Sequence, residues 1–318
     1  MSVLILVVAS ALSSAAPGAA RYEFDHAAMG TRFRIVLHAP RDVAADAAAD
    51  AFARVDEIDH RLSDYRVDSD LRRLELEAVG RPVPVHPDVW EVLDASQRLA
   101  AATGGAFDVT VGSLTRLWRW AARRGIDPDP ERVAAARART GYRQLVLDPE
   151  TRSVTLANPG VQLDAGGIAK GYAVDAAFEL LADRGLAIAL VDGGGDIRVG
   201  APPPASAGWS IAVPDGPDGA VRSVDVANMA IATSGSSYRQ RRVGEETFSH
   251  LVDPRSGLGV TAGRVVTVFA ATTTLADALA SALGVLGSPG CETARALGAT
   301  DAWVFETGIE DTGGDHGS

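Results

Sequence analysis

One segment, 163–175 (LDAGGIAKGYAVD), constrains the fold of this chain more than any other. An apolar run ends there at Asp164, Gly166 and Gly167 follow, and a helical pattern then carries Lys170. A strand, a glycine-rich turn and a helix in this order expose backbone N–H groups at the helix N-terminus, where anions bind. The segment therefore predicts a phosphate or pyrophosphate site with Lys170 as a nearby cation. The alternative is a tight turn whose glycines only permit positive φ, since neither GxGxxG nor GxxxxGKS/T is present.

The overall charge limits the classes of ligand. The 318 residues are 47% apolar, which predicts a globular fold of one large domain or two modest ones. The formal net charge of −11 argues against a nucleic-acid-binding surface, which requires a basic face. It also repels an anionic ligand unless a metal ion or local dipoles compensate. The single cysteine, Cys291, excludes an intrachain disulfide and a multi-thiolate zinc site.

The N-terminal residues 1–20 have the pattern of an export signal. An apolar stretch from Val3 to Leu12 is followed by small residues, as before a signal-peptide cleavage site, and is too short to span a bilayer comfortably. We therefore expect an exported protein, in the periplasm or at the outer face of the cytoplasmic membrane. No cysteine follows the apolar stretch, so an N-terminal lipoprotein anchor is not expected. The alternative is a buried first strand. The polar end, 307–318, is expected to fray.

Periodicity between these ends predicts α+β layers rather than a regular βαβ repeat. We expect a helix from Asp42, acting as cap, to about Leu62, and another from Pro87 to about Gly104. A hairpin is expected across 148–150. Further strands are expected at 32–38, 187–191, 197–199, 209–213, 221–226, 230–233, 265–270 and 302–305, and further helices at 114–118, 130–140, 168–184 and 274–286.

Eight motifs occur in an order that resembles the ApbE-type FAD:protein FMN transferases. They are MGT (29–31), LSDYRVDSDL (62–71), GGAFDVTVGSLTRLW (104–118), LDAGGIAKGYAVD (163–175), LVDGGGDIRVG (190–200), IATSGSSY (231–238), SHLVDPRSG (249–257) and LADALASALGVLG (275–287). The resemblance implies an ApbE-like, T-fold-like α+β architecture with layered helices on mixed or antiparallel sheets. It implies one catalytic domain with two lobes over 21–306.

The resemblance also implies an activity. Enzymes of this family cleave the pyrophosphate of FAD, transfer FMN to a threonine hydroxyl of a target protein and release AMP, with Mg²⁺. Their targets carry a motif ending in S/T-G-A-T, and we expect the acceptor to be a membrane or exported redox protein, with no nucleic-acid partner. Two alternatives stay open: an FAD pyrophosphatase that gives FMN and AMP, and a flavin-binding carrier or maturation accessory without turnover.

The expected metal ligands are the backbone carbonyl of Gly167 and the side chains of Asp277 and Ser281. Asp277 and Ser281 lie four residues apart, hence on one face of the expected helix, and both offer hard oxygen atoms suited to Mg²⁺. Without the resemblance, this spacing is more often a solvated helix face. Some family members carry a second Asp where Ala280 stands here, so this site has less negative charge than theirs.

The resemblance assigns FAD contacts to eight positions. Asp164 is expected to accept a hydrogen bond from the flavin or ribityl part, with a helix N-cap as the alternative, and Lys170 to neutralise pyrophosphate charge. Met29 and Tyr65 are expected to pack on FAD, with ordinary core positions as the alternative. The remaining positions expected to line this pocket are Ala106, Phe107, Asp108 and Val252.

Proton transfer from the attacking threonine is assigned to His250 and Asp253 as candidate catalytic residues, because His titrates in the useful range. The alternative is a structural His that supports the turn before Asp253. The segment DGGGD (192–196) lacks a following helix pattern, so we interpret it as a tight turn packed against the first glycine-rich segment. Glu75 stands where the family usually has Asn, which leaves the hydrogen bond of that amide without an equivalent.

Overall fold

A computed structural model describes residues 20–216, 219–235, 241–243, 246–261 and 263–306, with the backbone alone for 241–243, 246–250 and 261. Nearly all of the expected export signal and the whole of the expected C-terminal tail lie outside these residues. Among the described residues, no helix is both long and apolar enough to cross a bilayer.

A seven-stranded sheet forms the centre of the structure, with every neighbouring pair antiparallel. Exposed and more buried residues alternate in the edge strand over 20–28, whereas the strand over 264–270 is buried continuously from Val265 to Ala270. In spatial order they are β1 (Ala20–Ala28), β2 (Thr31–Ala39), β6 (Ala189–Gly193), β7 (Asp196–Val199), β10 (Met229–Gly235), β14 (Arg264–Ala270) and β15 (Ala299–Glu306).

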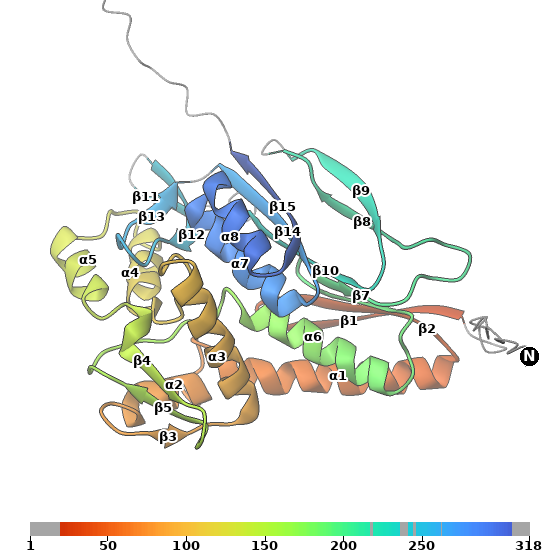
Figure 1. Cartoon of the computed structure of the whole chain (residues 1–318), viewed down its shortest axis with the longest axis horizontal. Coiled ribbons are helices and arrows are strands. Elements are labelled where there is room, and N and C mark those ends of the chain that lie inside the picture. The colour runs from red at the N-terminus through yellow and green to blue at the C-terminus, as the bar shows by residue number, and fades with distance from the viewer. Residues whose placement is uncertain (1–19, 217–218, 236–240, 244–245, 262, 307–318) are drawn as a thin grey trace, which may run out of the picture.

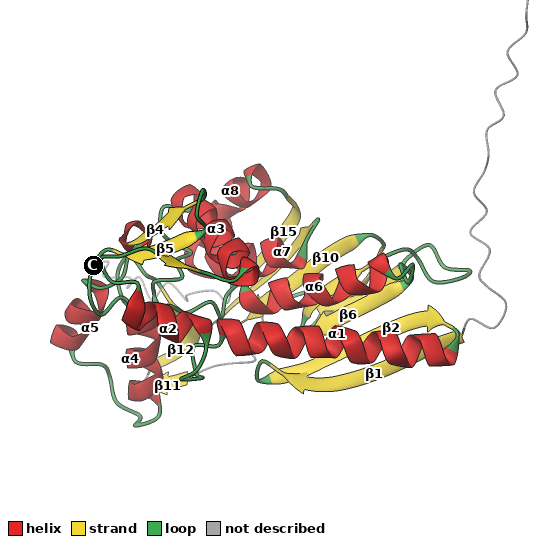
Figure 2. Ribbon diagram, turned by 90° about the horizontal axis from the view of Figure 1, so that it is seen from below, coloured by secondary structure: helices red, strands yellow, loops and turns green. Residues whose placement is uncertain are grey.

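Three long helices cover one face of this sheet: α1 (Arg41–Leu62), α6 (Ala169–Asp183) and α7 (Thr273–Leu286). Figure 2 shows α1 and α6 side by side across the strands. In α1 the apolar positions expected to recur every three or four residues are buried at Ala47, Ala51, Val55, Ile58 and Leu62, whereas the expected position Val43 is exposed. The expected cap at Asp42 is wrong. The helix begins at Arg41, directly after an extended Pro40, so Asp42 already lies in its first turn.

A two-stranded hairpin, β8 (Trp209–Pro214) and β9 (Val221–Val226), packs on the opposite face of the sheet. Its alternating residues Trp209, Ile211 and Val213 are buried in a second apolar cluster with Val36 and Phe269 of the sheet. Figure 1 shows this hairpin on the far side of the sheet from α1 and α6. The layers are therefore helices, sheet and hairpin.

A second lobe gathers at one end of α1 (Figure 1). The expected hairpin across 148–150 is confirmed there by β4 and β5, which pair from Leu145 with Leu156 to Asp148 with Ser153. The lobe contains α2 (Asp70–Glu77), β3 (Val83–Pro84), α3 (Pro87–Ala102), α4 (Gly112–Ala122), α5 (Pro130–Arg137), η1 (Tyr142–Gln144), β4 (Leu145–Asp148) and β5 (Ser153–Leu156), with β11 (Arg241–Val243), β12 (Glu246–Val252) and β13 (Gly259–Thr261) beside α4. The remaining elements, η2 (Ser288–Gly290) and α8 (Cys291–Ala296), precede β15. The expected α+β class is confirmed.

Candidate active site

The glycine-rich segment connects the second lobe to the N-terminus of α6. The backbone N–H of Asp164 donates to the carbonyl of Val109 at 2.8 Å, and the N–H of Leu163 donates to Glu75 Oε1 at 2.9 Å. Asp164 Oδ1 accepts from the N–H of Gly166 at 2.9 Å. Asp164 therefore stabilises the turn before α6. Because α6 begins only at Ala169, Asp164 is not its N-cap, and that alternative is wrong.

Two glycines bring α6 and α7 into close contact. A β-carbon on Gly167 would lie 2.9 Å from Ser281 Oγ and 3.3 Å from the Phe107 ring. A β-carbon on Gly171 would lie 2.7 Å from the carbonyl carbon of Thr273 and 2.9 Å from Asp277 Cβ. No larger residue fits at these distances, so the glycines have a packing role as well as a turn role. The structure thus brings together the three expected metal-binding groups, at Gly167, Asp277 and Ser281.

The charges at this contact are buried and unbalanced. Asp277 is 6% exposed and accepts from the N–H of Gly171 at 3.1 Å. Lys170, the only lysine among the 318 residues, forms an ion pair with Asp196 and lies 3.6 Å from Asp277. Burial, followed by the neighbouring Asp277, raises the pKa of Asp196, and Lys170 opposes that rise. Two buried carboxylates therefore share one lysine.

A second network joins Asp164 to the exposed Tyr65 through Arg119 of α4. Arg119 pairs with Asp164 at 2.7 Å and with Asp64 at 2.5 Å, and Thr115 Oγ1 also donates to Asp164 at 2.7 Å. The guanidinium lies 4.8 Å above the Tyr65 ring, which is 76% exposed. Burial and then Asp164 raise the pKa of Asp64, against the attraction of Arg119. Tyr65 is thus not a core residue and offers an accessible aromatic surface.

The β1–β2 turn and the β6–β7 turn lie against the same region. Met29 has a φ of 52°, an uncommon conformation for a residue other than glycine, and its side chain is partly buried against the main core. In the DGGGD turn, a β-carbon on Gly194 would lie 3.0 Å from Thr31 Cγ2, and one on Gly193 would lie 2.7 Å from Val174 of α6. The interpretation of DGGGD as a tight turn packed on the first glycine-rich segment is confirmed.

The other residues expected to contact FAD differ in position. Ala106 and Phe107 are both buried, and the Phe107 ring reaches Gly167 as described above. Asp108 Oδ1 accepts from the N–H and the hydroxyl of Thr110, at 2.8 and 2.7 Å, and burial raises its pKa against these hydrogen bonds. The side chain of Val252 is buried in an apolar cluster with α4 and α5. Any contact between Val252 and a ligand would therefore come from its backbone.

The two candidate bases lie in or just after β12. The backbone of His250 belongs to β12, and its side chain lies outside the described residues. Asp253 is hydrogen bonded to the backbone N–H and the guanidinium of Arg255, at 2.9 Å each. Burial tends to raise the pKa of Asp253, but the bonds from Arg255 outweigh it and hold the pKa below the ordinary value. Asp253 is therefore a weak base that shapes the turn before β13.

Asp175 and Glu75 support the site by hydrogen bonds that the sequence did not predict. Asp175 accepts from the N–H groups of Thr273 and Thr274, at 2.8 and 2.7 Å, and so holds the first turn of α7 against α6. Glu75 pairs with Arg116 at 2.8 Å in addition to its bond to Leu163. The signals were present, since Asp175 closes the glycine-rich motif and Glu75 replaces an expected Asn.

A pocket of about 930 Å³ lies on another side of α6, between α3, α8 and the N-terminus of α7. Its walls include Leu99, Tyr172, Leu180 and Leu275, and no residue expected to bind FAD or metal lines it. The pocket is therefore separate from the contact between Gly167 and Ser281.

Known proteins match almost the whole chain. The FAD:protein FMN transferase of Klebsiella pneumoniae is 32% identical over 287 residues, covering 87% of this chain and 82% of the relative. Among solved structures, the apo form of the Pseudomonas stutzeri flavinyl transferase ApbE has a TM-score of 0.80 at 29% identity, covering 91% of this chain and 92% of its own. The ApbE protein of Thermotoga maritima has a TM-score of 0.78 at 30% identity, covering 88% and 93%. Since the model of the ApbE family also matches residues 29–303, this chain belongs to the ApbE family.

Proposed function

We propose that this chain transfers FMN from FAD to a threonine hydroxyl of an acceptor protein, releasing AMP, with Mg²⁺ bound at the contact between α6 and α7. Flavin transfer is the activity in the names of the curated relatives, of which this chain covers more than two thirds. The observation that carries the finer proposal is the juxtaposition of Gly167, Asp277 and Ser281 beside Lys170.

The donor set fits a magnesium ion. A backbone carbonyl, a carboxylate and a hydroxyl are hard oxygen ligands, and Mg²⁺ usually takes few protein ligands and completes its shell with water and phosphate. No cluster of three or more His, Cys, Asp or Glu suited to a metal occurs in the part of the chain that the structure describes, so a mixed set is needed. When both carboxyls are ionised, Lys170 cannot neutralise Asp196 and Asp277 together, which favours a further cation. The ion would neutralise charge on the diphosphate.

The chain's own residues would bind and orient FAD. The ammonium of Lys170, beside the glycine-rich turn, would offset charge on the diphosphate. Phe107 contributes an apolar wall at Gly167, and Met29 and the exposed ring of Tyr65 contribute apolar surface for the flavin.

Transfer forms a bond between the threonine oxygen and the phosphorus of FMN, while the bond from that phosphorus to the AMP oxygen breaks. The threonine proton needs an acceptor. We assign it to His250, because Asp253 is committed to Arg255 and its pKa is held low. Water in place of threonine would give FMN and AMP, which is the pyrophosphatase alternative.

One observation keeps the carrier alternative in the test. Ala280, at the position where some relatives have a second Asp, has no side-chain oxygen atom and packs in the main core. A weaker metal site would favour FAD binding without turnover.

Export to the periplasm or the outer face of the cytoplasmic membrane is a separate proposal, supported by the apolar stretch from Val3 to Leu12. N-terminal sequencing of secreted material tests it.

The test is to incubate the protein with FAD, Mg²⁺ and a domain that carries the S/T-G-A-T acceptor motif. An FMN-sized mass increment on the domain with release of AMP supports transfer, free FMN with AMP supports hydrolysis, and unchanged bound FAD supports a carrier. Asp277→Asn should lose turnover, whereas Asp88→Asn, another buried and ion-paired Asp, should keep it. Full turnover of Asp277→Asn, or of the wild type in excess chelator, contradicts the metal assignment.

A further inference from the structure

Positive charge is concentrated on one part of this acidic chain. Between Gly112 and Arg143, which covers α4, α5 and the start of η1, there are eight arginines and three acidic residues. Two of these arginines are committed to the site: Arg116 pairs with Glu75, and Arg119 pairs with Asp64 and Asp164. The other six require a separate explanation.

These six arginines are exposed and form no ion pair within 4 Å with any carboxylate of the described residues. Among the other arginines whose side chains the structure describes, only Arg41, Arg81 and Arg152 lack such a partner. Six of the nine arginines without such a partner therefore lie within residues 123–143. We call these six the arginine surface: Arg123, Arg124, Arg132, Arg137, Arg139 and Arg143.

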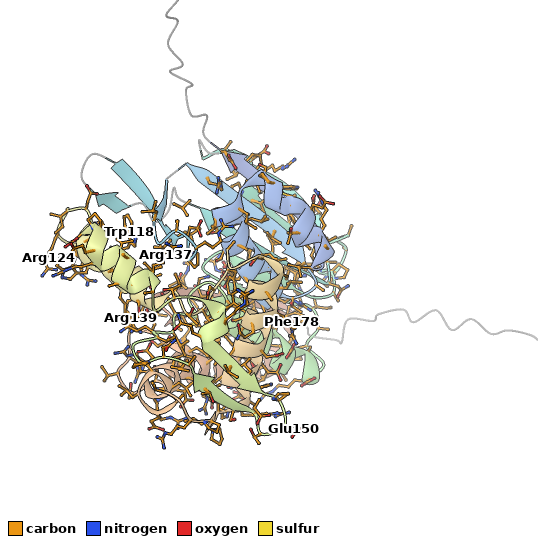
Figure 3. All side chains as sticks on the ribbon, turned by 60° about the vertical axis from the view of Figure 1, so that its left-hand side comes forward. Trp118, Arg124, Arg137, Arg139, Glu150 and Phe178 are labelled. Atoms are coloured by element: carbon orange, nitrogen blue, oxygen red, sulfur yellow. The ribbon has the colours of Figure 1, made fainter. Side chains whose placement is uncertain are left out.

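Aromatic rings hold part of the arginine surface in place. The guanidinium groups of Arg124 and Arg132 lie 4.4 and 5.2 Å from the centre of the Trp120 ring, and that of Arg143 lies 4.9 Å from Tyr142. Stacking leaves the N–H donors at the edge of each guanidinium available for a carboxylate. Figure 3 shows Arg124, Arg137 and Arg139 on the lobe that α4 and α5 form.

The same lobe borders the candidate site. Arg119 of α4 contacts Asp164 and Tyr65, as described above, and the Arg139 side chain lies 3.1 Å from the β-carbon position of Gly160, just before the run that leads into Asp164. A partner seated on the arginine surface would therefore lie beside the glycine-rich turn. With a net charge of −11, this protein repels an acidic partner over most of its surface.

We infer that the arginine surface docks an acidic acceptor protein, whose Asp and Glu side chains lie near the threonine that receives FMN. This inference rests on the proposed function, since it names how the partner of that reaction is recognised. Charge complementarity of this kind raises the rate of association and selects orientation more than it raises affinity. The surface then acts on the acceptor and not on FAD.

The test compares two variants of the full chain with the same change of charge. Arg123→Glu/Arg124→Glu/Arg132→Glu alters the arginine surface, and Arg41→Glu/Arg81→Glu/Arg152→Glu alters the unpaired arginines elsewhere. Each is assayed for binding to an acceptor domain of net negative charge, for kcat/KM of transfer to that domain, and for Kd of FAD. The first variant should lose on the order of 10–1000-fold in kcat/KM for the acceptor and most of its salt dependence, with an unchanged Kd for FAD. The control should stay near the wild type.

Equal losses in both variants, or no loss in either, would overturn the inference. A membrane role would also overturn it. In that case the wild type binds anionic phospholipid vesicles, and the first variant no longer binds them but still transfers FMN to the acceptor at the wild-type rate. Binding of the acceptor domain is measured also without FAD and Mg²⁺. A wild type that binds the domain through the arginine surface but transfers no FMN contradicts the proposed function and leaves the docking surface in place.

Discussion

The substitution Gly171→Ala tests whether close approach of α6 and α7 sets the geometry of the site. A β-carbon at this position would lie 2.7 Å from the carbonyl carbon of Thr273 and 2.9 Å from Asp277 Cβ, whereas ordinary contact begins at 3.4 Å. The neighbouring atoms belong to the backbone of the first turn of α7 and to a short side chain, so they cannot rotate away. The two helices must therefore part by about 0.7 Å or more at this point.

The effects on stability and on activity should differ in size. Overpacking costs about 1–3 kcal/mol, and replacing a helical glycine by alanine returns about 1 kcal/mol, so the free energy of unfolding should fall by at most about 2 kcal/mol. The displacement moves Asp277 away from the N–H of Gly171, with which it is hydrogen bonded at 3.1 Å. Misplacing a binding group by about 1 Å can cost roughly 100-fold in rate.

Gly284→Ala supplies the matched control. Gly284 is also a buried glycine of a helix, α7, but the nearest atom to its β-carbon position is the terminal methyl of Leu251, which can rotate. Urea denaturation and AMP release from FAD are measured for both variants. We expect Gly284→Ala to keep its activity and Gly171→Ala to lose most of it. A Gly171→Ala variant that is as stable and as active as the control would refute the role of helix contact.

Three other changes test separate parts of the structure. Asp175→Ala removes the acceptor for two first-turn N–H groups of α7 and should lower the free energy of unfolding by about 1–3 kcal/mol in urea, with Asp175→Asn losing less because one oxygen remains. Burial raises the pKa of Asp108, so its stabilising contribution is complete below pH 3.8 and is lost as the pH rises through the raised pKa. Asp108→Asn should accordingly gain in Tm relative to the wild type between pH 4 and pH 7, and a constant difference would contradict that reasoning. Acylation by an N-hydroxysuccinimide ester can modify only the N-terminal amine and Lys170 among amines. FAD with Mg²⁺ should slow both the modification of Lys170 and the loss of activity, as mass spectrometry of the peptides can show.

Local patterns were sufficient for the parts of the site that lie within one element. The spacing of Asp277 and Ser281 placed both on one face of α7, and the glycines at 166 and 167 predicted the turn before α6. Contacts between distant segments could not be predicted in this way. Asp175 binds the start of α7 across 98 residues, and Glu75 binds Leu163 across 88 residues, so no periodicity connects either pair.

Helix α4 explains why motifs far apart in the sequence act as one unit. One side of this helix of 11 residues carries Thr115 and Arg119, which bind Asp164. An adjacent face carries Trp118, whose Nε1–H donates at 2.9 Å to the carbonyl of Gly257 at the end of the SHLVDPRSG motif. Because the helix is rigid, the turn after β12 and the glycine-rich turn keep a fixed separation. Under the proposed function, this helix would set the distance between a base from β12 and a nucleotide on the glycine-rich turn.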